Sequence, residues 1–186
     1  MPATSHQPLA SSRFNRPLAF ILAAVVALVG TYVVARSFAA TNPALYVTPS
    51  TGTYTVGSTV VASVRMNSGT DLVNDTQVNF QYDPTKLQYA SMSTTGSPFD
   101  AAAGTVLVSG GVISFNRYVS SGSTSGDQLV ATITFNTIGQ GTANFSFPGG
   151  STVTPTAVYR TSDATNIFTT GGTASWTISR PRHSKH

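Results

Sequence analysis

The sequence predicts an all-β body of about nine short strands, folded as a sandwich or barrel, behind one N-terminal transmembrane helix. The chain has no glutamate, and only 9% of its residues are charged. Threonine, serine, glycine and valine are abundant, which favours strands and turns over helices. Beyond residue 40, apolar and polar residues alternate in short runs that turn residues separate. An uncharged apolar run precedes this body and predicts the helix.

The apolar run Pro17–Ala35 carries no charged residue. At about 1.5 Å per residue it reaches roughly 28 Å, which is enough to cross the hydrocarbon core of a bilayer. Residues 1–16 are polar, end with Arg13 and Arg16, and are expected to form a disordered cytoplasmic segment. Because positive residues mark the cytoplasmic side, we expect a single-pass protein of the cell membrane whose body lies outside.

Two interpretations of residues 17–39 stay open. Ser37, Ala39 and Ala40 are small residues of the kind that signal peptidase accepts, which is typical of a cleaved signal peptide and a secreted body. The length of the apolar run and Arg36 directly after it favour an uncleaved signal-anchor. In both cases the body, residues 41–179, is extracytoplasmic, and residues 180–186 form a solvated basic tail.

The body divides into short strand patterns between turns. They lie at Leu45–Thr48, Thr53–Val56, Thr59–Asn67, Thr105–Ser109, Val112–Val119, Gln128–Ile138, Thr142–Phe147 and Thr173–Ser179. The clearest alternation is in Gln128–Ile138, where Leu129, Ala131, Ile133 and Phe135 are expected on one face. Gly110 and Gly111 predict a two-residue hairpin turn between their flanking strands. The run Ser151–Thr170 is less regular.

The stretch Asp75–Tyr89 predicts a strand, a sharp turn and a second strand. Val78, Phe80 and Tyr82 alternate with amide side chains, so one face is apolar and the other can form hydrogen bonds. Asp83 and Pro84 interrupt this alternation, because proline cannot donate to a ladder and aspartate accepts backbone N–H bonds at a turn. The apolar row is therefore expected in the core, and the amide row outside.

Several classes of function are excluded by composition. The chain has no cysteine, and its three histidines, His6, His183 and His186, all lie near its ends. The body therefore has no disulfide, thiolate site, histidine metal site or Ser-His-Asp triad. Between residues 41 and 179 there are four basic and six acidic residues, so no basic face for nucleic acid is expected. The six aspartates lie mostly in turn contexts, which argues against a paired-carboxylate glycosidase, and no cofactor is expected.

The order of these patterns resembles a cohesin domain. The most specific element is Tyr82-Asp83-Pro84-Thr85-Lys86-Leu87, followed by GVISF at 111–115 and QLVATITF at 128–135. A G-x-G-x-A-x-F-x-F hairpin at 139–147 completes the pattern. The resemblance implies a jelly-roll β-sandwich and a non-catalytic module that docks a dockerin-like protein, in polysaccharide degradation or cell-surface attachment.

The resemblance also implies where the partner binds. In the family the docking face includes the outward side of the strand before the Tyr-Asp-Pro turn, which corresponds here to Asp75, Gln77 and Asn79. The neighbouring strand would add Asn116 and Tyr118. Short polar groups around one aromatic anchor suit a hydrogen-bonded protein interface.

Three alternatives remain beside protein docking. A platform of Trp176, Tyr46 and Tyr159 would bind polysaccharide directly, although alternation places Trp176 on the same face as core residues. A purely structural surface subunit is the second alternative. Third, Asp71, Asn74 and Asp75 are oxygen-rich and close in sequence, which makes them candidate calcium ligands, although the spacing of an EF-hand is missing.

Overall fold

The computed structural model describes residues 44–150 and 154–181, which contain β-strands and no helix. The strands are β1 (Ala44–Thr48), β2 (Thr51–Thr55), β3 (Thr59–Asn67), β4 (Val73–Gln81), β5 (Leu87–Ser93), β6 (Ala101–Ala102), β7 (Leu107–Ser109), β8 (Val112–Tyr118), β9 (Asp127–Thr137), β10 (Gly141–Phe145), β11 (Ala157–Arg160), β12 (Thr170–Gly171) and β13 (Ala174–Ser179). The all-β prediction is confirmed. These thirteen strands exceed the expected nine chiefly because β6 and β12 are only two residues long and β11 lies in the run that was predicted to be less regular.

The predicted segments 1–16 and 17–39 lie outside the described residues, as does the tail beyond residue 181. All thirteen strands belong to one compact unit within residues 40–186. In the part of the chain that the structure describes, no helix is long and apolar enough to cross a membrane.

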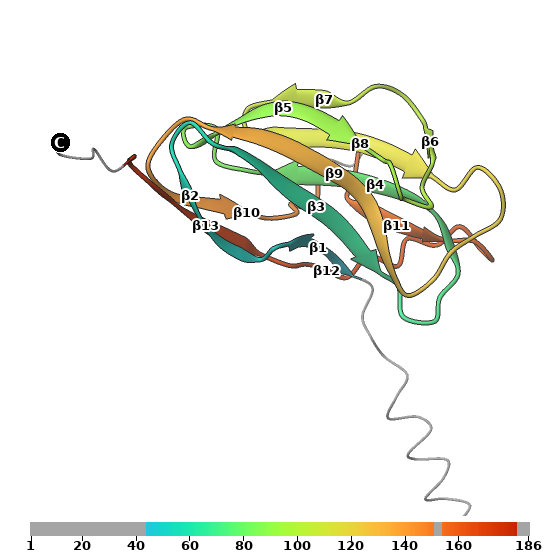
Figure 1. Cartoon of the computed structure of the whole chain (residues 1–186). Helices are drawn as coiled ribbons and strands as arrows, with labels where there is room; N and C mark the ends of the chain where they lie inside the picture. Colours follow the sequence, from blue (N-terminus) through green and yellow to red (C-terminus); the bar gives the residue numbers. More distant parts are fainter. Residues whose placement is uncertain (1–43, 151–153, 182–186) are drawn as a thin grey trace, which may run out of the picture. The chain divides into compact units, whose positions relative to one another are not determined.

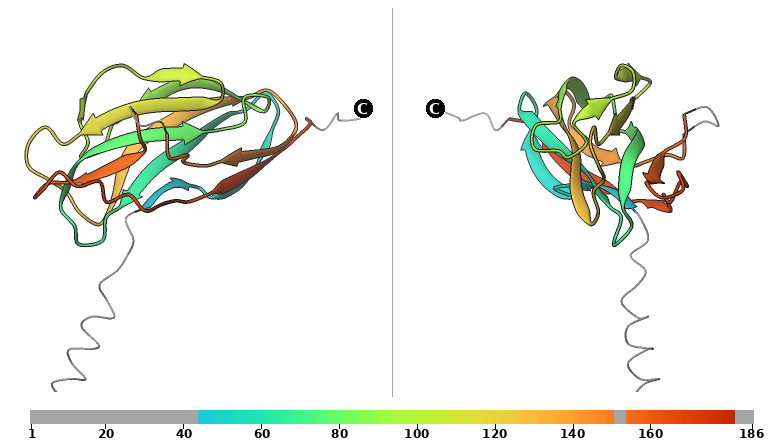
Figure 2. Two further views of the ribbon diagram at one scale, coloured as in Figure 1. Left: turned by 180° about the vertical axis from the view of Figure 1, so that it is seen from behind. Right: turned by 90° about the vertical axis from the view of Figure 1, so that its right-hand side faces the viewer.

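Three sheets make up the sandwich (Figure 1). Sheet A has the order β12-β1-β3-β9-β5, sheet B the order β10-β13-β2, and sheet C the order β11-β4-β8-β6, with β7 also paired to β8. Sheets B and C are linked where the backbones of Gln81 and Ser146 exchange two hydrogen bonds. The end-on view in Figure 2 shows the strands of sheet A and of sheet C as two facing layers.

Strand β9 is the centre of sheet A, since it pairs with both β3 and β5. Ala131, Ile133 and Phe135 are fully buried as the alternation predicts. Leu129 differs from the prediction, because Val64 pairs with Ala131 while the next residue of β3 pairs with Leu129. This β-bulge makes Val130 the extra residue, so Val130 is buried and Leu129 faces outward with the side chain of Arg65.

Phenylalanines from all three sheets meet in the core. Phe80 of β4 stacks on Phe145 of β10 with ring centroids 5.4 Å apart, and Phe135 of β9 lies 6.4 Å and 6.1 Å from these two rings. Trp176 of β13 meets the edge of Phe145 at 4.6 Å. All four side chains are at most 1% exposed. Aromatic pairs at such distances contribute about 0.5–1.5 kcal/mol each beyond the burial of their area, so they hold the layers together.

The predicted turn at Asp83 and Pro84 carries the chain from sheet C into sheet A. The Asp83 carboxylate accepts hydrogen bonds from the Thr85 backbone N–H at 2.9 Å and from its hydroxyl at 2.6 Å. These bonds, with the nearby Lys86 ammonium, hold the pKa of Asp83 below its usual range. The backbone N–H groups of Lys86 and Leu87 donate to the Asp83 carbonyl. The interpretation of Asp83 as a turn-capping residue is therefore confirmed.

The Gly110-Gly111 hairpin packs directly against this turn. Both glycines have positive φ angles, 56° and 78°, as a two-residue type I′ turn requires. The Tyr82 N–H donates to the Gly111 carbonyl at 2.8 Å. A Cβ atom on Gly111 would lie 2.8 Å from the Tyr82 carbonyl oxygen and 2.9 Å from Pro84 Cδ, whereas one on Gly110 would meet nothing within 4 Å.

These two glycines give a matched test of that contact. Gly110→Ala is expected to lower the free energy of unfolding by about 1 kcal/mol, because only the positive φ is unfavourable. Gly111→Ala is expected to cost about 2–4 kcal/mol, because the backbone of Tyr82 must also move. Urea unfolding followed by tryptophan fluorescence measures both, and equal losses would show that the close approach contributes nothing.

Candidate functional site

The outward side of sheet C carries most of the predicted docking residues. We define the sheet C face as the outward side chains of Asp75, Gln77, Leu107, Ser114, Asn116, Tyr118 and Tyr159. Antiparallel pairing places Asp75 opposite Tyr118 and Gln77 opposite Asn116. The intervening residues Thr76, Val78 and Phe115 are buried on the other side of the sheet. Side chains at directly opposed positions share a face, so the sequence prediction of one outward row is correct for these four residues.

The centre of the sheet C face is polar and organised by hydrogen bonds. The Asn116 side-chain amide donates to Asp75 Oδ1 at 2.7 Å, and the Gln77 amide donates to the Phe115 carbonyl at 3.3 Å. Partial burial raises the pKa of Asp75, and the hydrogen bond from Asn116 opposes that shift without cancelling it. The centre therefore presents a carboxylate in a less polar environment than bulk water, which favours a hydrogen-bond donor from a partner.

Asn79 is a correction to the predicted docking row. It lies on the outward side of β4, but the segment that follows β10 covers it, and it is only 4% exposed. Its amide donates to the Thr154 carbonyl at 2.9 Å and to the Thr156 hydroxyl at 3.2 Å, and its oxygen accepts from the Ser114 hydroxyl at 2.7 Å. Asn79 therefore fastens this covering segment to sheet C and is not available to a partner.

Apolar side chains border the polar centre on the side of β7 and β8. Tyr118 is 38% exposed, and Leu107 of β7 is 63% exposed. Leu107 was not predicted as a site residue, although the Gly110-Gly111 hairpin fixes its pairing with Ser114 and hence its outward direction. Tyr159 of β11 pairs with Asp75 on the other side of the centre. No local pattern places Tyr159 there, because β11 follows the irregular run and joins β4 only through long-range pairing.

The predicted aromatic platform for polysaccharide does not form. Trp176 is fully buried and donates its indole N–H to the Pro49 carbonyl at 2.9 Å. Tyr46 belongs to sheet A, where its hydroxyl donates to Asp127 Oδ1 at 2.5 Å beside Arg65. Tyr159 belongs to sheet C. Three rings on separate sheets, one of them in the core, cannot stack along one sugar chain.

The candidate calcium ligands are directed to different partners. An Asp71 oxygen lies 3.6 Å from the Arg160 guanidinium, whereas Asp75 accepts from Asn116. Asn74 is the extra residue of a β-bulge, because Tyr159 pairs with Asp75 while Arg160 pairs with Val73. No group of three histidine, cysteine, aspartate or glutamate side chains that could hold a metal ion is found within residues 44–150 and 154–181.

Comparison with protein-family models matches the cohesin domain over residues 45–170. The chain belongs to the cohesin family. This family match covers most of residues 41–179 and confirms the resemblance carried by the Tyr-Asp-Pro turn and the strands after it. A search of curated proteins finds no match.

Solved cohesins share the fold at low sequence identity. The complex of CaDoc0917 with CaCohA2, a cohesin from Clostridium acetobutylicum, matches at 17% identity and a TM-score of 0.58, covering 74% of this chain and 99% of the other. The sixth cohesin of scaffoldin B from Acetivibrio cellulolyticus, solved with a Cel5 dockerin, matches at 20% identity and a TM-score of 0.59. The match covers 74% of this chain and 99% of the other. A non-cellulosomal cohesin from the archaeon Archaeoglobus fulgidus matches at 15% identity and a TM-score of 0.58. The match covers 74% of this chain and 91% of the other.

The raised pKa of Asp75 predicts a specific pH dependence. A carboxyl whose pKa is higher in the folded state binds protons more tightly there, so it lowers stability as pH rises through its unfolded pKa, about 3.9, to its folded value. Asp75→Asn keeps a hydrogen-bond acceptor for the Asn116 amide. It also removes the loss of stability that ionisation of the carboxyl causes as the pH rises. Relative to the unmodified chain, the variant is expected to gain stability between about pH 3 and pH 7.

Urea unfolding of both proteins at the two pH values measures this difference. The other five aspartates are present in both chains, so their titration cancels in the comparison. A stability difference that is constant with pH, or that changes in the opposite direction, would contradict the burial of Asp75 at the centre of the sheet C face.

Proposed function

We propose that this cohesin is a non-catalytic, extracytoplasmic docking module that binds a dockerin-type protein through the sheet C face. The observation that carries the proposal is the arrangement of this face, with exposed Leu107 and Tyr118 beside the hydrogen-bonded pair of Asp75 and Asn116. The solved relatives CaCohA2 and the sixth cohesin of scaffoldin B are described in complexes with dockerins. Those complexes concern these relatives, and they motivate the same class of partner here.

The two apolar side chains would supply most of the binding energy. Residues that dominate interfaces are usually large side chains that lose all contact with water, while polar neighbours provide register and exclude solvent. Tyr118 offers a ring and a hydroxyl from a rigid strand, and Leu107 offers an aliphatic group from the edge strand beside it. Gln77, Asn116 and Asp75 would then orient the partner through hydrogen bonds.

The export and tethering of the module belong to the same proposal. The uncharged run at 17–35 and the arginines before it support a body outside the cell that is held at the membrane or released by cleavage. A cohesin at the cell surface would recruit dockerin-bearing proteins there, including those that degrade polysaccharides.

Truncation of the two apolar side chains tests the docking face. In pull-downs with dockerin-bearing proteins of the same organism, Tyr118→Ala and Leu107→Ala are each expected to weaken binding about tenfold or more, because each loses a buried anchor. Val61→Ala is the matched control, since Val61 is 45% exposed on β3 of sheet A. Unchanged binding by both sheet C variants, or an equal loss with the control, would show that the partner does not use this face.

Cysteine labelling tests the location. The chain has no cysteine, so Ser93→Cys in the exposed end of β5 would create a unique thiol in the sandwich. A membrane-impermeant maleimide is expected to label this variant in intact cells, and to label Ser5→Cys in the N-terminal segment only after lysis. The reverse pattern would contradict the proposed orientation.

A further inference from the structure

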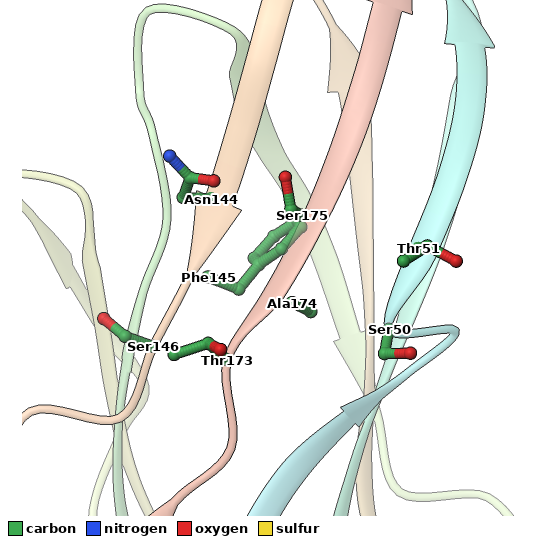
Figure 3. A pocket seen from close by; sticks show the side chains of 8 residues that line it. All are labelled: Ser50, Thr51, Asn144, Phe145, Ser146, Thr173, Ala174 and Ser175. Atoms are coloured by element: carbon green, nitrogen blue, oxygen red, sulfur yellow. The ribbon is translucent and has the colours of Figure 1, made fainter.

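A hollow on the outer side of sheet B has no role in the docking proposal. It has a volume of about 460 Å³ and is lined by Ser50, Thr51, Asn144, Phe145, Ser146, Thr173, Ala174 and Ser175 (Figure 3). A second hollow of about 350 Å³ shares Asn144 and Ser146 with the first and extends to Gln81, Asp83 and Pro84. The shared residues make the two hollows one groove, which we call the sheet B groove. None of its lining residues belongs to the sheet C face.

The lining of the larger hollow carries no charge and combines polar groups with a larger apolar area. It offers five hydroxyl groups and the Asn144 amide, while the side chains of Phe145 and Ala174 point into the core. Hydroxyl and amide groups both donate and accept hydrogen bonds. Among the described residues, the side chains of Thr51, Asn144 and Ser175 make no hydrogen bond to the protein. This chemistry suits a neutral ligand that is itself rich in hydroxyl groups, and it offers nothing to balance an ionic one.

The register of sheet B arranges these groups in a row across the strands. Asn144 pairs with Ser175, and Ser175 pairs with Thr51, so one outward row crosses β10, β13 and β2. Ser146 lies two residues after Asn144, and Thr173 lies two residues before Ser175. Because β10 and β13 are antiparallel, both residues extend the row toward the same end of the sheet. Neighbouring strands are about 4.8 Å apart, which is close to the advance of one unit in a β-linked sugar chain. A saccharide lying across the strands would therefore meet one polar side chain at each unit.

An extended peptide is a poorer fit for the same groove. Peptides that bind to sheets usually pair with a free strand edge and use its unpaired backbone groups. The larger hollow lies across β10, β13 and β2, and the backbone groups of the central strand β13 are already paired on both sides. A ligand here must rely on side-chain hydrogen bonds, which hydroxyl groups along a sugar chain can supply.

We infer that the sheet B groove binds a neutral saccharide chain, as a site separate from the docking face. The Asn144 side chain would donate and accept hydrogen bonds at the centre of the groove. Ser175 and Thr51 lie on one side of it and Ser146 on the other. The Asp83 carboxylate and Pro84 ring at the far end would contact the next sugar unit. Groups of this kind, without an aromatic platform, give weak binding, in the millimolar range for one short chain and stronger through repeated contacts on a polymer.

The test follows amide signals by NMR while neutral hexasaccharides are added to the full chain. Cellohexaose, xylohexaose and chitohexaose are the probes, and the detergent must be sugar-free and zwitterionic. At up to about 20 mM, at least one probe is expected to shift the Asn144 side-chain amide together with the backbone signals of Thr51 and Ser175. Asn144→Ala and Ser175→Val are each expected to weaken that binding about fivefold, the effect of one lost hydrogen bond.

Matched controls separate this site from the docking face and from general adhesion. Thr134→Val removes a hydroxyl from an outward position of β9 on sheet A, and should leave saccharide binding unchanged. Tyr118→Ala should also leave it unchanged, even where it abolishes dockerin binding. No shift with any probe, shifts centred on Tyr118, or equal shifts with a neutral serine- and threonine-rich decapeptide would each overturn the inference.

Discussion

The contact of Phe80, Phe135 and Phe145 is the constraint on which the rest of the structure depends. Each ring comes from a different sheet, and the three centroids lie within 6.4 Å of one another. The position of Phe80 fixes which side of β4 faces the core. Because side chains alternate along a strand, that choice also fixes Gln77 and Asp75 on the outer side. The core thus determines the composition of the sheet C face without contributing a residue to it.

The same constraint explains why the outer surfaces differ. On sheet C, β7 ends at a hairpin turn that leaves Leu107 exposed opposite Ser114, and Tyr118 is exposed four residues further along β8, so apolar side chains border the polar centre at two places. On sheet B, the outward positions of β10 and β13 hold only small polar residues, and short side chains leave a hollow. One chain therefore presents a surface suited to a protein and a surface suited to a sugar, on different sheets.

Local pattern predicted most of the fold, since alternation identified Phe80, Phe135 and Trp176 as core residues and Gly110-Gly111 as a turn. The candidate site was predicted only where both partners lie in regular strands, as with Gln77 and Asn116. Asn79 was misplaced because its cover comes from residues more than 70 positions away, joined by side-chain hydrogen bonds that leave no periodic signal. Tyr159 was misplaced for a related reason, since only its long-range pairing with Asp75 of β4 determines which sheet it belongs to and which face of that sheet it occupies.

The route of the chain through sheet B also bears on how the molecule carries load. The described chain begins with β1, continues into β2, and leaves through β13 at one end of the sandwich (Figure 1). Strands β2 and β13 are parallel and paired over five residues, from Thr51 with Ser175 to Thr55 with Ser179. A pull on the two ends would slide these strands past each other, so their hydrogen bonds would resist in shear and break together. A sandwich with this path is suited to transmit tension between whatever holds its two ends.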